Sequence, residues 1–154
     1  MNFEQLQPQI IQLAQEDNNI EILWLYGSYA NEMAHKNSDI DLAVVFKTWE
    51  KDVIERRLRP ELLAIEWQQE LSLKDGQLSV LDMAIAPILI AMATLKSVRL
   101  LLSKNISRQL QEQQRIMSKW EIDYLHHYQN QQAIVTIQLI FLTSIMDRFF
   151  SPSF

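Results

Sequence analysis

The chain of 154 residues lacks cysteine altogether and contains only two glycines and four prolines. Without cysteine it can form no disulfide, no thiolate metal site and no thiol nucleophile, and this absence fits a reducing cytosol. Lys and Arg are missing from the first 35 residues, so the basic start of a secretory signal peptide is not there. The most apolar window, residues 133–146, is too short to span a membrane. We therefore expect a cytoplasmic protein with no membrane partner.

A basic composition is absent as well. The formal net charge is −5, which argues against a broad nucleic-acid interface, because such an interface needs a basic face. Apolar residues make up 48% and charged residues 21% of the chain, as in ordinary globular proteins, and the length suits one domain. The sequence therefore predicts a folded domain with no direct nucleic-acid partner.

The chain is organised around one stretch, residues 22–46. An apolar run ends at Gly27-Ser28, ten residues follow, and Asp39-x-Asp41 opens a second apolar run. Side chains two residues apart in a strand share a face, so Asp39 and Asp41 project together and repel each other. Mg²⁺ would remove this repulsion, and Mg²⁺ held by two carboxylates usually takes substrate phosphates as further ligands. Gly27 lets the backbone approach a phosphate, and Ser28 offers it a hydroxyl and an N–H.

These residues carry a resemblance. Gly27-Ser28 and Asp39-x-Asp41, with the string SDIDLAV, resemble the signature of the nucleotidyltransferase superfamily that has a polymerase-β-like palm. The small size is similar to the minimal MNT-type nucleotidyltransferases, which serve as antitoxins beside HEPN-domain toxins. The resemblance covers residues 20–104. It implies that Asp39 and Asp41 are catalytic and hold Mg²⁺, while Gly27 and Ser28 bind the phosphates of ATP.

The family pattern is not matched at two places. Asn31-Glu32 stands where the family usually has an Arg-Gly pair, which removes a positive charge and a flexible position near the phosphates. The third carboxylate of the family, a general base for the attacking hydroxyl, falls on Ser79 in the best alignment. Asp82 could supply it if the strand register is shifted, or it could cap the following helix. We therefore give Asp82 a provisional catalytic role and leave a two-carboxylate or degenerate site open.

Hydrophobic periodicity predicts both helices and strands, and hence an α/β fold. The resemblance implies that a small mixed sheet with flanking helices has the nucleotidyltransferase palm arrangement, and a C-terminal helical hairpin is expected to follow it. We expect the nucleotidyltransferase domain over residues 1–104 and the helical extension over residues 105–154. Pro60 is expected to split one helical span, because proline is not tolerated in a helix interior. The expected helices are 3–16, 29–33, 49–58, 60–71 and 87–96, and the expected strands are 21–26, 40–46, 77–83 and 98–102.

Residues 105–150 contain no glycine or proline and are predicted to be helical, with a soft break at residues 129–132 that would make the hairpin. The arm from residue 133 is apolar on most sides, so it packs on its own core or on another protein, and we favour a partner or a second copy. His126 and His127 lack the spacing of a metal pair and are interpreted as surface or packing residues. Six basic residues against a single Glu112 form either a solvated surface or an electropositive patch: Lys96, Arg99, Lys104, Arg108, Arg115 and Lys119.

The resemblance implies a function. The chain would be an antitoxin that uses Mg²⁺ to transfer AMP from ATP to a hydroxyl, most simply a tyrosine, of a cognate HEPN RNase toxin, and this AMPylation would neutralise the toxin. One alternative is an antitoxin that acts by binding and occlusion, with a vestigial active site; the two departures favour it. Another is an antibiotic-modifying nucleotidyltransferase, although such enzymes usually need a larger second domain to build the acceptor pocket.

Overall fold

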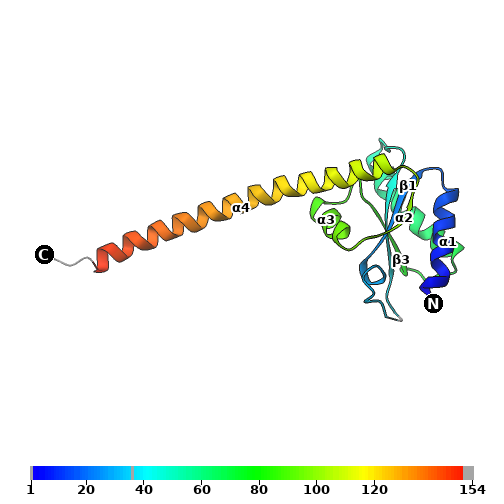
Figure 1. Ribbon diagram of the computed structural model, residues 1–154, viewed down its shortest axis with the longest axis horizontal. Coiled ribbons are helices and arrows are strands. Elements are labelled where there is room, and N and C mark those ends of the chain that lie inside the picture. The colour runs from blue at the N-terminus through cyan, green and yellow to red at the C-terminus, as the bar shows by residue number, and fades with distance from the viewer. Residues whose placement is uncertain (1, 36, 151–154) are drawn as a thin grey trace. The chain divides into compact units, whose positions relative to one another are not determined.

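The structure, a computed structural model, describes residues 2–35 and 37–150. In this part of the chain a four-stranded mixed sheet, in the order β3-β2-β1-β4, is flanked by helices (Figure 1). This arrangement confirms the predicted α/β class. The elements are α1 (Phe3–Glu16), β1 (Ile20–Tyr26), the 3-10 turn η1 (Gly27–Tyr29), β2 (Ile40–Phe46), α2 (Val53–Glu70), β3 (Leu78–Asp82), α3 (Ile88–Lys96), β4 (Arg99–Ser103) and α4 (Ile106–Phe150).

The two central strands, β1 and β2, are the ones with nearly continuous apolar runs. β1 pairs antiparallel with both β2 and β4, whereas β2 pairs parallel with β3. Because side chains alternate along a strand, each central strand contributes to two cores, one on each face of the sheet. The core toward α1 and α2 includes Ile10, Leu23, Leu25, Leu42, Val44 and Trp67. The core toward α3 and the beginning of α4 includes Trp24, Ala43, Val45, Met83, Ala91 and Ile116.

α2 continues through Pro60 as a single helix of 18 residues, so the predicted division near Arg59 is wrong. A proline in this place forfeits one backbone hydrogen bond and crowds the preceding turn. Pro60 is itself buried, and Leu63 and Trp67 on the same helix pack in the core. The burial of this helix face offsets the cost of the proline. α2 also begins later than predicted, because Asp52 caps its first turn.

The segment after β1 is not the helix that was predicted over residues 29–33. It forms the turn η1, in which the N–H groups of Ala30 and Asn31 donate to the carbonyl of Gly27 at 3.1 and 3.3 Å. Glu32 then has a φ of +60°. This left-handed conformation is incompatible with a continuing α-helix, so the chain turns away toward β2.

α4 is continuous from Ile106 to Phe150, so the predicted helical hairpin is wrong. Residues 129–132 are three glutamines and one asparagine, and without glycine or proline nothing there ends a helix. The chain divides into two compact units, unit 1 up to Met117 and unit 2 from Ser118, with the boundary inside α4. The expected domain boundary lay at residue 104, before this helix. Among the described residues, no helix combines the length and apolar character that crossing a membrane requires.

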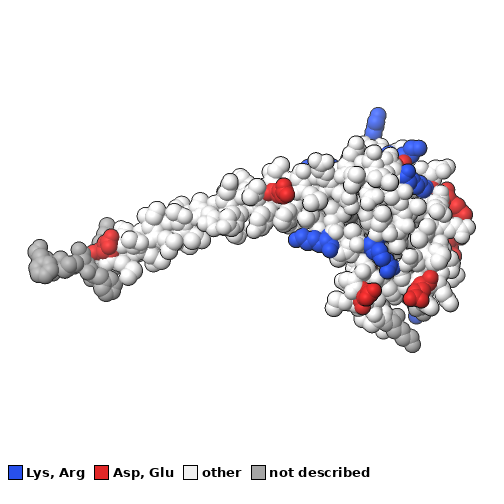
Figure 2. Space-filling model, in the orientation of Figure 1, with Lys and Arg blue, Asp and Glu red and all other residues white. Residues whose placement is uncertain are grey.

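Several basic residues of the possible electropositive patch are engaged inside the fold. Lys104 Nζ donates to the carbonyl of Asp17 at 2.8 Å and thereby caps the end of α1. Arg99 donates to a glutamine of α1 at 2.8 Å, and Arg115 donates to the carbonyl of Met83 at 3.0 Å. On the face shown in Figure 2, Lys and Arg are scattered rather than gathered. These contacts favour the solvated-surface interpretation of the basic cluster.

Candidate active site

Three side chains form a row across one face of the sheet. Tyr26, the last residue of β1, is directly opposite Asp41 on β2, and Asp41 is in register with Ser79 on β3. Residues in register on neighbouring strands point to the same face. The row therefore lies at one end of the sheet, on the face that also carries Trp24 and Ala43.

Gly27 is required where it stands. Its φ is +71°, in the left-handed region that favours glycine. A Cβ at this position would overlap Asp41 Oδ2 and would lie 3.2 Å from Asp41 Cγ. The backbone of the Gly27-Ser28 turn thus packs directly against the Asp41 carboxylate. Ser28 is partly exposed, and its carbonyl accepts the N–H of Met33 at 3.0 Å, which holds the turn closed.

The two aspartates of the motif interact electrostatically. Burial raises the pKa of Asp41, and the negative charge of Asp39 raises it further. Asp39 precedes β2, is exposed, and borders an open hollow of about 640 Å³ between the start of α1 and the α2–β3 loop. An ionised Asp41 beside Asp39 is therefore a costly arrangement without a cation. A pair of repelling carboxylates beside a close-approach glycine fits Mg²⁺, which prefers oxygen ligands and keeps positions for phosphate.

Tyr26 is a site residue that the sequence reasoning missed. Tyr26 on β1 and Ser79 on β3 flank Asp41 on the strand between them, and the Ser79 side chain acts on the pKa of the Tyr26 phenol. Burial raises the pKa of Tyr26, the charge of Asp41 raises it further, and the hydrogen bond from Ser79 lowers it. Its position directly before Gly27 was the available signal. That position indicates a site residue only once the strand register is known, because the register places Tyr26 opposite Asp41.

Asp82 does not join the carboxylate pair. It is in register with Val44, which faces α2, whereas Ser79 is in register with Asp41. The pairing of β2 with β3 contains no bulge, so three positions of separation place Ser79 and Asp82 on opposite faces. The structure therefore brings Ser79, rather than the provisional Asp82, into the row with Asp41. Among the described residues no cluster of three His, Asp or Glu side chains could hold a metal ion.

Asp82 has contacts of its own on that opposite face. Its Oδ1 accepts the N–H of Ala84 at 3.0 Å, and its Oδ2 lies 3.8 Å from Arg59 Nη2. Burial raises the pKa of Asp82, while the Ala84 N–H and Arg59 lower it. Arg59 also donates to the carbonyl of Thr48 at 3.0 Å and stacks over Phe46. These contacts tie β3 to α2 and to the end of β2.

In the loop after the Gly27-Ser28 turn, Glu32 adopts a left-handed backbone conformation that usually favours glycine. Glu32 occupies the position where the resemblance places the Gly of an Arg-Gly pair, and its φ is +60°. A side chain in this conformation costs about 1–2 kcal/mol, since Cβ crowds the following carbonyl. The Asn31 side chain accepts the N–H of Met33 at 3.2 Å and so belongs to the turn.

The sequence matches the family model described as polymerase beta, nucleotidyltransferase over residues 8–107. No curated protein matches it. Several solved structures share its fold. A chain of a toxin–antitoxin crystallised with AMP-PNP has a TM-score of 0.62 at 22% identity, covering 86% of this chain and 98% of that one.

The second structure is a complex of tri-AMPylated Shewanella oneidensis HEPN toxin with an MNT antitoxin, with a TM-score of 0.59 at 18% identity. The third is the toxin–antitoxin MntA-HepT, with a TM-score of 0.58 at 18% identity. Each of these two alignments covers 88% of this chain and 98% of the matched chain. At such identities the similarity establishes the fold.

Proposed function

Because the chain belongs to the polymerase β nucleotidyltransferase family, we propose that it transfers AMP from ATP to a tyrosine hydroxyl of a cognate HEPN RNase toxin and so neutralises that toxin in the cytoplasm. The observation that carries this proposal is the packing of Gly27 against the Asp41 carboxylate with Asp39 beside it. Two structural neighbours support it. One is a toxin–antitoxin with AMP-PNP, and the other contains a tri-AMPylated HEPN toxin with an MNT antitoxin.

In the proposed reaction the toxin hydroxyl attacks the α-phosphorus of ATP. The bond from that phosphorus to the bridging oxygen breaks, AMP becomes joined to the toxin, pyrophosphate leaves, and the hydroxyl proton passes to water or a base. Asp39 and Asp41 would hold Mg²⁺, while the N–H groups of Gly27 and Ser28 would hold the terminal phosphates. A bound Mg²⁺ would neutralise the charge that develops on the pyrophosphate.

The arm of α4, residues 118–150, is assigned to contact with the toxin. Between Asp123 and Asp147 it carries no charged residue, and Figure 2 shows this stretch almost uniformly white. Large apolar side chains are exposed along it, among them Leu125, Val135, Leu139, Phe141 and Leu142. A helix with this much apolar surface is stable in water only when another surface covers it.

One observation favours a second candidate, an antitoxin that binds and occludes its toxin without transferring AMP. The position in register with Asp41 that would hold a third carboxylate is Ser79. A serine cannot act as the general base for an attacking hydroxyl at neutral pH. In this candidate the site retains nucleotide and Mg²⁺ but does not use them.

The two candidates make opposite predictions in one experiment. The protein is incubated with α-labelled ATP, Mg²⁺ and the helical protein encoded beside its gene, and the label on that protein is measured together with its RNase activity. Asp39→Asn/Asp41→Asn removes both motif charges. Asp82→Asn is the matched control, since it removes one carboxylate on the opposite face of the sheet.

AMP transfer predicts that label and RNase inhibition appear together, that both are lost in Asp39→Asn/Asp41→Asn, and that both survive in Asp82→Asn. Occlusion predicts tight binding and inhibition without label, unchanged in the double variant. That second result would overturn the transfer reaction and leave the antitoxin assignment in place.

A further inference from the structure

The outer face of α2 carries an exposed apolar stripe. Ile54, Leu58, Leu62 and Ile65 are exposed to 69%, 46%, 60% and 51% of their surface. Their spacing of four, four and three residues places them along one line of the helix, within an arc of about 80°. An arc this narrow is typical of a helix–helix seam rather than of a helix packed on a broad core.

The stripe has no role in the core of unit 1. The opposite side of α2 does that work, where Leu63, Ala64 and Trp67 are buried against the sheet. Isolated exposed apolar residues are ordinary on protein surfaces, but four in a line on one helix mark an interaction site. Replacing the exposed side chains should therefore leave the fold intact and change only what the surface binds.

Acidic residues border the stripe. Glu55 and Glu66 follow one edge, and Glu61 follows the other, with Arg57 as the single basic residue among the exposed flanking positions. Beside the first edge is a hollow of about 540 Å³, whose lining includes Leu58, Leu62, Glu50, Glu55 and Glu66. Within the part of the chain that the structure describes, no ion pair joins a basic side chain to Glu55 or Glu66.

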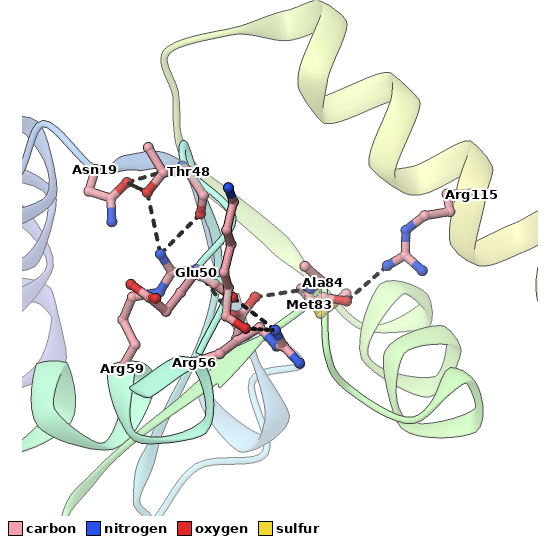
Figure 3. Close-up of polar contacts among 10 residues, drawn as sticks. Asn19, Thr48, Glu50, Arg56, Arg59, Met83, Ala84 and Arg115 are labelled. Carbon is pink, nitrogen blue, oxygen red and sulfur yellow. Dashed lines mark hydrogen bonds and ion pairs between the residues drawn. The ribbon is translucent and has the colours of Figure 1, made fainter. Parts of the chain in front are cut away.

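The arginines nearest to this hollow are turned to other partners. Arg59 donates to Thr48 and stacks over Phe46, and its side chain is only 18% exposed. Arg56 donates to the carbonyl of Glu50 at 2.8 Å (Figure 3), and it stacks over Trp49. The border of the stripe therefore presents carboxylates that a basic ligand can approach.

A second copy of the same face is a poor occupant. A two-fold pairing of antiparallel α2 helices that brings Leu58 against Leu62 also brings Glu55 opposite Glu66 of the second copy, twice in the dimer. In antiparallel helix pairs like edges meet, so the acidic edge would face itself. Such like-charge contacts disfavour association.

We propose that this face binds an amphipathic helix of another protein, whose apolar stripe is bordered by Lys and Arg. Leu58 and Leu62 would lie in the seam, and Glu55 and Glu66 would pair with the basic border. The apolar stripe supplies the buried area and the carboxylates supply orientation and selectivity. The surface uses neither the nucleotide nor the residues of the candidate active site, so it does not depend on AMP transfer.

The test uses the full chain and two synthetic helical peptides with the same leucine stripe, one bordered by lysines and the other by glutamates. Binding is measured by fluorescence anisotropy at physiological salt, where a Debye length of about 8 Å limits non-specific attraction. Leu58→Gln/Leu62→Gln alters the stripe. Ile106→Gln/Leu110→Gln is the matched control, because these two residues are also exposed on a helix of unit 1.

We expect the lysine peptide to bind at least about tenfold more tightly than the glutamate peptide. Leu58→Gln/Leu62→Gln should weaken it by about tenfold, while the control variant binds normally and both variants keep the wild-type melting temperature. Glu55→Lys/Glu66→Lys should reverse the preference between the peptides.

Three results would overturn the proposal. One is equal binding of the two peptides, and another is binding that is insensitive to the Leu58 and Leu62 substitutions. The third is a dimer in analytical ultracentrifugation that Leu58→Gln/Leu62→Gln dissociates, because it would make a second copy the occupant.

Discussion

The α-carbon of Gly27 packs against the carboxylate of Asp41, so that residue 27 has no space for a side chain. The two residues lie fourteen positions apart in sequence but meet where β1 ends and β2 begins. This contact holds the Gly27-Ser28 turn directly against a carboxylate suited to a cation. The proposed binding of a nucleotide phosphate with Mg²⁺ rests on this contact.

Gly27→Ala should destabilise the protein by at least about 1–2 kcal/mol from its positive φ alone, with a further cost from the overlap with Asp41. The overlap, but not the backbone strain, should disappear when Asp41 is shortened. In Gly27→Ala/Asp41→Ala, we therefore expect a loss smaller than the sum of the single losses, measured by urea unfolding. Strict additivity of the two substitutions would contradict the contact.

Glu32→Gly should stabilise the protein by about 0.5–1 kcal/mol, because glycine adopts φ +60° without strain, although it is more flexible in the unfolded chain. Glu32→Gln is the control: it removes the charge and keeps the strained backbone. Thermal unfolding should separate the two variants. If the loop approaches phosphate, both should bind ATP about two- to fivefold more tightly, by titration calorimetry. Equal stability of the two variants would refute the strain.

Asp82→Ala should lower stability by about 1–2 kcal/mol, because the Ala84 N–H loses its acceptor and Arg59 its ionic partner. Asp82→Asn preserves the acceptor and should cost less. Neither variant should change the affinity for Mg²⁺–ATP, since Asp82 lies on the face opposite Asp41. A large loss of nucleotide affinity in Asp82→Asn, with stability unchanged, would show that Asp82 belongs to the active site.

The sequence predicted the strands of the sheet well because their signal is local. The apolar runs of β1 and β2 can be recognised without knowledge of contacts. α2 was predicted wrongly because a local rule on Pro60 competed with burial of the helix face, and burial is a tertiary quantity. Tyr26 was missed for a related reason, since only the strand register reveals that it lies beside Asp41.

Acid should stabilise the metal-free protein around Asp41. The ordinary pKa of the group is 3.8, and burial and Asp39 raise it in the folded state, so the ionised form is disfavoured by folding. Stability should therefore increase as pH falls through the raised pKa toward 3.8, and Asp41→Asn should abolish this part of the dependence. Mg²⁺ binding should weaken over the same window because protons compete. Calorimetric melting with and without Mg²⁺ measures both effects. The prediction is wrong if, without metal, the parent loses stability as the pH falls through this window while Asp41→Asn does not.

Ser79→Asp should restore a third carboxylate. Ser79 is exposed and in register with Asp41, so an aspartate there points to the same face without entering a core. A positioned general base contributes about 10²–10⁴-fold to the rate of attack by a hydroxyl. If the parent transfers AMP slowly for want of this base, Ser79→Asp should accelerate the transfer within that range.

Ser79→Asn is the control, because it has the shape of aspartate without its charge and should not accelerate transfer. The third carboxylate should also destabilise the metal-free protein through repulsion by Asp41, and Mg²⁺ should reverse that loss. The rise in melting temperature on adding Mg²⁺ should therefore be larger in Ser79→Asp than in the parent. Equal rates in the two variants, together with an equal response to Mg²⁺, would show that residue 79 lies outside the reacting site, whatever its register with Asp41.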